Sequence, residues 1–93
     1  MTVGTGLLTL YFHGVQSLKE KRSILKSVLM RARNKFNAAI AEIDDHDLWQ
    51  KATVGIAVIA NSSVQAEKEL RNIIRFIESD PRLEVTFIDI EMR

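Results

Sequence analysis

Residues 3–34, VGTGLLTLYFHGVQSLKEKRSILKSVLMRARN, join a strand-like segment to a helix-like segment and decide the fold class. Residues 3–12 are rich in β-branched, aromatic and aliphatic side chains, which is typical of a β-strand. Ser17 and Glu20 form a capping-box pattern, in which each side chain satisfies a free backbone N–H at a helix start. Helical spacing then predicts a helix from Leu18 to about Asn34, with a core face of Leu18, Leu25, Val28, Leu29, Ala32 and Phe36.

The next three segments read as two strands and a second helix. Residues 36–44 and 51–60 have strand composition, and the polar connection between them predicts a hairpin. Ser62 and Gln65 repeat the capping-box pattern, and the helix that they open ends before Asp80-Pro81. The apolar face of this helix consists of Ala66, Leu70, Ile73, Ile74 and Ile77.

Residues 82–92 supply a last strand. Its apolar parity changes between Phe87 and Ile88, which indicates either a bulge or a strand that is apolar on both faces. The complete order is βαββαβ, the ferredoxin-like arrangement of four antiparallel strands with two helices on one face of the sheet. We therefore predict one α+β domain of the ferredoxin-like class over residues 1–93.

The face of the sheet opposite the helices is predicted to be covered. Such a face is usually solvated and polar. Residues 7–12 (LLTLYF) and 54–60 (VGIAVIA), however, are apolar at both parities. Because large exposed apolar patches mark interaction sites, we expect a homodimer that pairs through this open face.

The composition of the chain excludes several kinds of chemical site and indicates where the protein is found. The chain has 93 residues, 46% of them apolar, and no cysteine, which excludes disulfides, thiolate metal sites and cysteine nucleophiles. Residues 1–12 lack a basic leader and are too short to span a membrane. We expect a cytoplasmic protein that has no membrane partner.

Positive charge is concentrated on the first predicted helix. Residues 18–35 hold seven of the thirteen Lys and Arg residues and only one acid, so this segment carries +6 within a chain of net charge +1. Cations at the start of a helix oppose its dipole, at a cost of roughly 0.3–1 kcal/mol each, so an offsetting anion is expected. A stripe of this kind suits the phosphates of RNA, and the nucleic-acid-binding residues predicted from it are Lys19, Lys21, Arg22, Lys26 and Arg33.

Lys21 differs from the other four cations. Lys19, Arg22, Lys26 and Arg33 fall within about a 60° arc beside the apolar face, whereas Lys21 lies on the core side, where it snorkels to the edge or pairs with an acid. A competing interpretation treats the whole basic helix as a solvated face balanced by the acids of the hairpin.

Two aromatic residues of the first strand have alternative roles. Tyr11 and Phe12 are placed to stack on bases, as aromatic residues do in other sheet-based RNA-binding proteins, although core or dimer contacts are the favoured interpretation.

The sequence carries no pattern that favours an enzyme or a metal centre. Residues 44–49, DDHDLW, hold three carboxylates and a histidine, but consecutive residues in a short connection do not converge on one ion, and Trp49 is interpreted as an anchor of the hairpin or an interface residue. Neither His13 nor His46 has a nucleophile beside it. Residues 14–17, GVQS, resemble part of the acylphosphatase loop but lack its second glycine and its arginine. We predict no catalytic residue and no cofactor.

Most of the chain resembles the YlxP-like family, a bacterial domain of unknown function. The resemblance rests on residues 17–27 (SLKEKRSILKS), 33–61 (RNKFNAAIAEIDDHDLWQKATVGIAVIAN) and 76–81 (FIESDP). Its distinctive parts are the run from Gln16 to Arg22 and DLWQ at 47–50. It implies a ferredoxin-like fold and, since genes of this family tend to lie near those for translation initiation and ribosome assembly, an association with ribosomes or RNA. It brings no catalytic residues.

The leading hypothesis from the sequence is a non-enzymatic factor that contacts ribosomal RNA or a ribosomal subunit through the basic helix. The alternative is a homodimeric structural or regulatory module that binds a protein partner or a small ligand.

Overall fold

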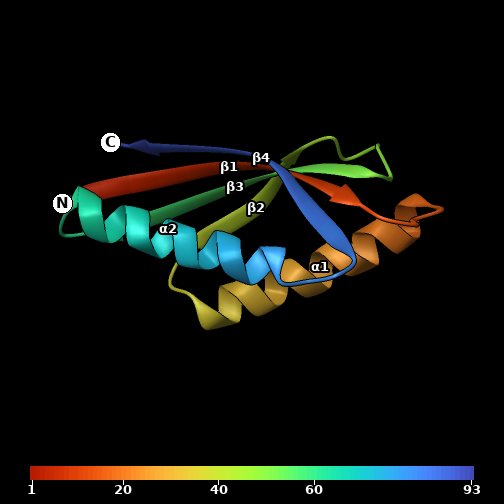
Figure 1. The fold of residues 1–93 in the computed structure, drawn as a ribbon, viewed down its shortest axis with the longest axis horizontal. Coiled ribbons are helices and arrows are strands. Elements are labelled where there is room, and N and C mark those ends of the chain that lie inside the picture. Colours follow the sequence, from red (N-terminus) through yellow and green to blue (C-terminus); the bar gives the residue numbers. More distant parts are fainter.

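The chain folds into six elements in the order βαββαβ (Figure 1). The computed structural model describes residues 1–93. The elements are β1 (Thr2–Phe12), α1 (Leu18–Lys35), β2 (Ala39–Asp44), β3 (Lys51–Ala60), α2 (Ser63–Glu78) and β4 (Leu83–Met92).

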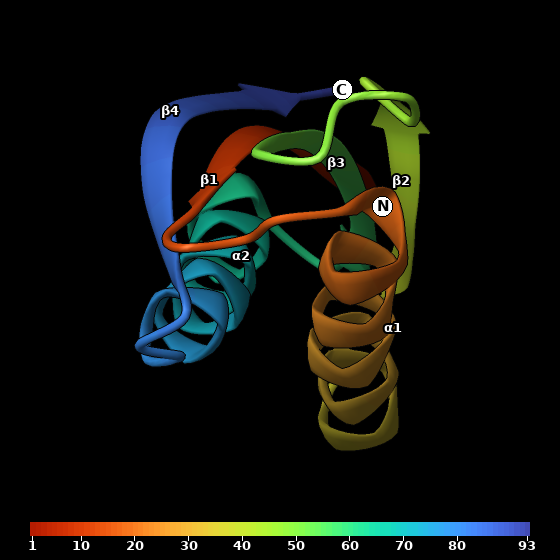
Figure 2. The same cartoon turned by 90° about the vertical axis from the view of Figure 1, so that its right-hand side faces the viewer.

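The four strands form one antiparallel sheet in the order β2-β3-β1-β4. Figure 2 shows both helices below the sheet, side by side on one face, with the opposite face uncovered. The predicted ferredoxin-like arrangement is therefore confirmed.

Alternation along the strands separates the two faces of the sheet. In β1 the even-numbered side chains Leu8, Leu10 and Phe12 are fully buried against the helices, whereas the odd-numbered ones, such as Leu7, line the open face. The central strand β3 has the same alternation. The buried side chains form one core of 19 residues between the sheet and the helices.

Two element boundaries differ from the prediction. α1 continues to Lys35, and the backbone N–H of its C-cap residue, Phe36, bonds to Ala32 O. The chain needs the following residues to turn, so β2 begins at Ala39 rather than at residue 36.

The predicted irregularity in the last strand is a β-bulge. The pairing of β1 with β4 shifts between Thr9, opposite Phe87, and Leu10, opposite Val85, which leaves Thr86 as the extra residue. The bulge reverses the parity of β4, so that Phe87 points to the open face and Ile88 to the helix side. β4 bends between its two halves in Figure 2.

The turn between α2 and β4 is tied to α1 by Asp80. Its carboxylate, only 7% exposed, accepts hydrogen bonds from the Arg82 backbone N–H (2.9 Å), from Arg82 Nε (3.0 Å) and Nη2 (2.7 Å), and from Arg31 Nη2 (3.1 Å). The hydrogen bonds from the Arg82 side chain hold the pKa of Asp80 well below its usual range. This cluster fixes the C-terminal end of α2 against the first helix.

Neither helix is both long enough and apolar enough to cross a bilayer.

Candidate nucleic-acid interface

The start of α1 is capped as its sequence predicts. Ser17 Oγ accepts a hydrogen bond from Glu20 N (3.2 Å), and Glu20 Oε2 accepts one from Gln16 N (3.3 Å). The returning bond from Glu20 therefore goes to the residue before the cap rather than to the cap itself. Glu20 also places negative charge in the first turn, where the helix dipole favours it.

Three cations of α1 form an exposed row with no partner. Lys19, Arg22 and Lys26 are exposed, and none of them forms an ion pair or a side-chain hydrogen bond within the chain. Their spacing of three and four residues places them on one side of the helix over about 10 Å of its axis. These three are the predicted nucleic-acid-binding residues that remain free to contact an external anion.

Arg33 extends this row but is partly engaged. Its Nε and Nη2 donate hydrogen bonds of 2.9 Å and 2.7 Å to Ile40 O at the outer edge of β2. Its side chain is exposed, and its remaining N–H groups are free of such bonds. Arg33 therefore joins α1 to β2 and contributes only part of its guanidinium to the exposed surface.

Lys21 is a structural residue, and its assignment to the nucleic-acid interface is wrong. Its side chain is fully buried, with Nζ 3.0 Å from Glu42 Oε2 and donating a hydrogen bond of 2.8 Å to Asp45 O. Lys21 lies on the side of α1 that packs against β2, and Glu42 of β2 is the acid with which it pairs. A phosphate in solution has no access to this ammonium group.

The other two cations of α1 face the second helix and the turn that follows it. Arg31 binds Asp80, and Lys35 Nζ lies over the rings of Phe36 and Phe76, 5.9 Å and 5.2 Å from their centroids. Both contacts are internal to the fold.

The aromatic residues of β1 separate by parity. Phe12 is fully buried under the sheet, which excludes it as a base-stacking residue. Tyr11 is 40% exposed on the open face, and its ring packs edge-on against His13, with centroids 5.2 Å apart. The alternation of side chains along β1 is the sequence signal that distinguishes the buried Phe12 from the exposed Tyr11.

The acids of the β2–β3 connection have separate internal contacts. Asp45 adopts a left-handed conformation (φ 65°), and its Oδ2 accepts a hydrogen bond of 2.6 Å from Thr53 Oγ1. His46 Nε2 lies 3.9 Å from Glu42 Oε1. Trp49, interpreted from the sequence as a hairpin anchor or an interface residue, is 43% exposed.

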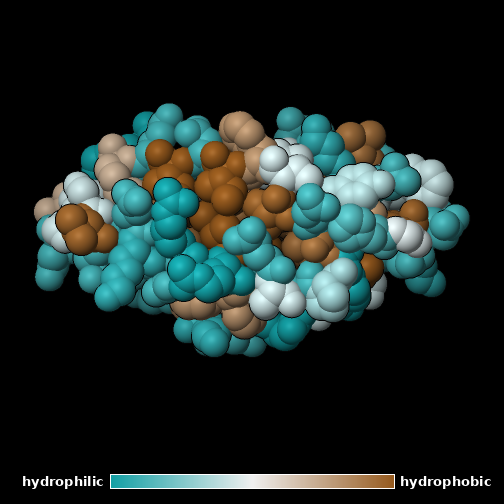
Figure 3. Space-filling model, viewed as in Figure 1, coloured by the Kyte–Doolittle hydropathy of each residue, from teal (hydrophilic) through white to brown (hydrophobic).

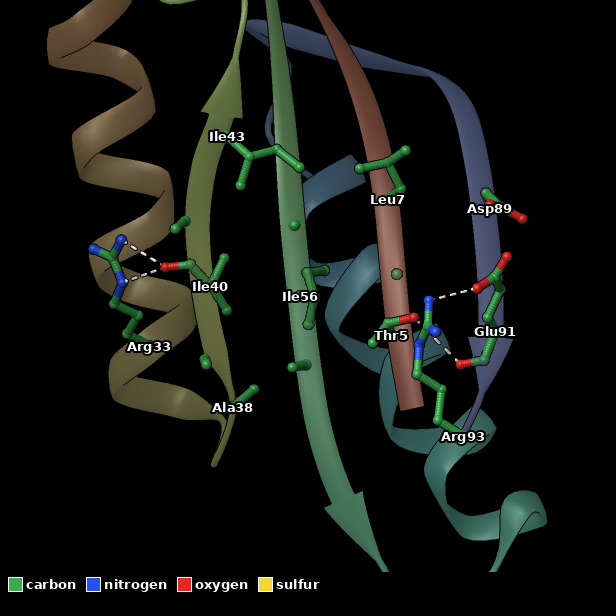
Figure 4. A pocket seen from close by; sticks show the side chains of 15 residues that line it. Thr5, Leu7, Arg33, Ala38, Ile40, Ile43, Ile56, Asp89, Glu91 and Arg93 are labelled. Carbon is green, nitrogen blue, oxygen red and sulfur yellow. Dashed lines mark hydrogen bonds and ion pairs between the residues drawn. The ribbon is translucent and has the colours of Figure 1, made fainter. Parts of the chain in front are cut away.

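The open face contains a hollow that the sequence did not localise (Figure 4). It has a volume of about 730 Å³ and lies over β2, β3 and β1, where small side chains leave space beside Leu7 and Ile43. Arg33 lies at its β2 side, and Asp89, Glu91 and Arg93 lie at its β4 side. The small residues at its floor are Ala39, Ala41, Gly55 and Ala57.

Comparison with solved structures defines the class of protein. The solution NMR structure of a de novo designed protein with ferredoxin fold matches 100% of this chain and 85% of the design, with a TM-score of 0.53 at 20% identity. The chain is thus an α+β protein of the ferredoxin-like class.

The family follows from sequence comparison. Residues 3–91 match the family described as "Protein of unknown function (DUF503)". The "Uncharacterized protein YlxP" of Bacillus subtilis (strain 168) is 49% identical over 75 residues, which cover 81% of this chain and 82% of that protein. The chain belongs to this family, which confirms the resemblance seen in its sequence.

Proposed function

We propose that this protein is a cytoplasmic, non-enzymatic factor that binds ribosomal RNA or a ribosomal subunit through the exposed cations of α1. The observation that supports the proposal is the row of Lys19, Arg22 and Lys26, three exposed cations without a partner in the chain. Cations arranged along about 10 Å of a helix match a chain of phosphates better than a single small anion. Contacts of this kind position an RNA without reading its sequence.

The comparison between the two helices strengthens the proposal. On α2 two of the three exposed cations have local partners: Arg71 Nε lies 3.5 Å from Glu67 Oε2, and Arg75 Nη1 donates to Asn72 Oδ1 at 3.2 Å, whereas Lys68 has none. The cations of α1 that serve the fold are also paired, as Lys21 and Arg31 are. Three neighbouring cations without a partner therefore occur on the solvent side of α1, against the single Lys68 on α2.

The test is the salt dependence of binding to isolated ribosomal subunits and to ribosomal RNA. A protein that neutralises three phosphates changes the slope of log K against log salt by about 2 to 3. We expect wild-type protein to co-sediment with subunits at low salt, and the triple variant Lys19→Gln, Arg22→Gln, Lys26→Gln to lose about that much of the slope.

The matched control removes three exposed cations from α2, as Lys68→Gln, Arg71→Gln and Arg75→Gln. This variant has the same net charge as the first one but keeps the α1 row, so its salt slope should stay close to that of the wild type. The proposal is wrong if wild-type protein binds neither RNA nor subunits at low salt, or if binding survives charge reversal at Lys26 and Arg33.

The hollow on the open face supports a second candidate function, a homodimeric module. A two-fold axis parallel to the strands places β4 of one copy over β2 of the other, because the strand order is β2-β3-β1-β4. The acids Asp89 and Glu91 of one copy then lie over the Arg33 side of its partner, and the side chains of β1 lie over the small residues of β3.

Sedimentation velocity from micromolar to millimolar protein tests this candidate. We expect a dimer, and we expect Ala57→Arg, which fills the floor of the hollow with a charged side chain, to remain a monomer that keeps the wild-type circular dichroism spectrum. A wild-type protein that is monomeric over the whole range rules out the pairing.

A further inference from the structure

The two edges of the sheet differ in how their backbone groups are satisfied. Val3 and Arg93 exchange both backbone hydrogen bonds (Val3 N to Arg93 O 3.2 Å, Arg93 N to Val3 O 2.7 Å). In an antiparallel pair such exchanging pairs occur at every second residue. Asp89 and Glu91 therefore also bond to β1, as their pairing with Leu7 and Thr5 requires. Three residues alternate with the bonded ones along β4, namely Ile88, Ile90 and Met92. Their backbone N–H and C=O groups therefore point away from β1, outward from the edge of the sheet.

The same alternation, continued across the sheet, turns the carbonyl of Ile40 outward from the opposite edge strand, β2. That carbonyl is the one to which Arg33 donates two hydrogen bonds. β2 is also short, and α1 packs beside it. On the β2 edge, Arg33 of the first helix thus occupies one outward carbonyl, whereas the Phe87–Met92 edge of β4 presents three outward N–H and three outward C=O groups to solvent.

An apolar surface accompanies the open edge on the helix side. Ile88 is 39% exposed, and Ile90 and Met92 are only partly buried against the core. Figure 3 shows hydrophobic atoms gathered in the middle of this side of the molecule, between β4 and α2. A strand added at this edge would extend the sheet and place every second side chain against this apolar surface.

The acidic side chains on the open face of β4 determine which kind of strand can pair with this edge. Asp89 and Glu91 stand next to each other on the open face of β4; Glu91 Oε2 lies 2.7 Å from Arg93 Nη2 in an exposed pair, and Asp89 forms no ion pair. If two copies paired β4 with β4 about Ile90, the Asp89 of each would lie opposite the Glu91 of the other. Like charges directly opposite are destabilising, so the acids oppose self-pairing.

We propose that the Phe87–Met92 edge of β4 binds an extended protein segment that alternates apolar and basic residues, by strand addition. The apolar residues of the segment pack beside Ile88 and Ile90, and its basic residues lie opposite Asp89 and Glu91. The backbone of the segment satisfies the outward groups of Ile88, Ile90 and Met92. This site is separate from the cation row of α1.

The probe is a peptide of alternating lysine and valine with the length of Phe87–Met92, and the readout is amide hydrogen exchange measured by NMR. In the free protein, the amides of Ile88, Ile90 and Met92 should exchange fast while those of Asp89 and Glu91 are protected. The peptide should slow exchange at the three outward amides specifically. Packing of two sheets through the open face would not produce this pattern.

Matched reagents separate backbone pairing from charge. A peptide of alternating glutamate and valine, and a lysine peptide N-methylated on its pairing edge, should both fail to bind. Asp89→Asn with Glu91→Gln should raise the dissociation constant of the lysine peptide by about tenfold. Ile90→Pro removes an outward N–H that β1 does not use, and it should abolish binding that Ile90→Ala retains.

Three results would overturn the proposal. The first is a lysine peptide that does not bind at millimolar concentration. The second is equal binding of the lysine and glutamate peptides. The third is binding that leaves exchange at Ile88, Ile90 and Met92 unchanged.

Discussion

Replacing Lys21 with Met should lower the free energy of unfolding by about 3–5 kcal/mol, because it leaves the buried carboxylate of Glu42 without its counter-charge. The Glu42 side chain is 17% exposed and its Oε2 is buried, so water replaces the lost ammonium group only in part. The substitution also removes the hydrogen bond to Asp45 O, which joins α1 to the start of the β2–β3 connection. Urea unfolding with a shared m-value measures the loss.

Two further variants show whether the pair causes the effect. Lys26→Met, on the exposed side of the same helix, should change stability by less than about 0.5 kcal/mol. The double variant Lys21→Met, Glu42→Leu replaces the whole pair with apolar side chains and should recover most of the loss. If Lys21→Met costs no more than Lys26→Met, the pair does not hold the hairpin against the helix.

Local patterns were enough to predict the elements and their order. The N-cap residues Ser17 and Ser62 start both helices as predicted, because a cap depends only on neighbours within one turn, although the Glu20 and Gln65 side chains bond to Gln16 and Glu69 rather than back to the cap. The change of parity in β4 was also visible in the sequence, but the pairing with β1 decides that it is a bulge, at Thr86, rather than a strand apolar on both faces.

The partners of the charged residues could not be predicted from the sequence. Lys21 lies on the core side of its helix, which is a local signal that it is buried. That its acid is Glu42 depends on where β2 packs against α1, and this contact is long-range. The engagement of Arg33 likewise depends on which carbonyls of β2 point outward. Sequence reasoning thus found the row of cations. It also counted Lys21, outside that row, among the binding residues, and it did not predict that Arg33 is partly engaged by β2.

Replacing Asp80 with Asn should lower the free energy of unfolding by about 2–3 kcal/mol at neutral pH. The amide keeps the shape of the side chain but offers only one acceptor atom, where the carboxylate accepts four hydrogen bonds. One amide N–H then also faces an arginine, which donates and does not accept. The estimate is kept below that of a fully buried pair because Arg31 and Arg82 are each about half exposed and solvent screens them.

The contribution of Asp80 should depend on pH in a defined direction. Its pKa is lowered in the folded state, first by the hydrogen bonds from the Arg82 side chain, and an unfolded chain has a pKa near the ordinary value of about 3.9. As the pH falls below about 4, the unfolded state takes up the proton first, so the stability that the carboxylate contributes is lost progressively toward the lower folded pKa. The difference in unfolding free energy between the wild type and Asp80→Asn should therefore stay constant above about pH 5 and shrink below about pH 4. A difference that is the same at pH 7 and pH 3 would mean that the ionised carboxylate does not stabilise the turn between α2 and β4.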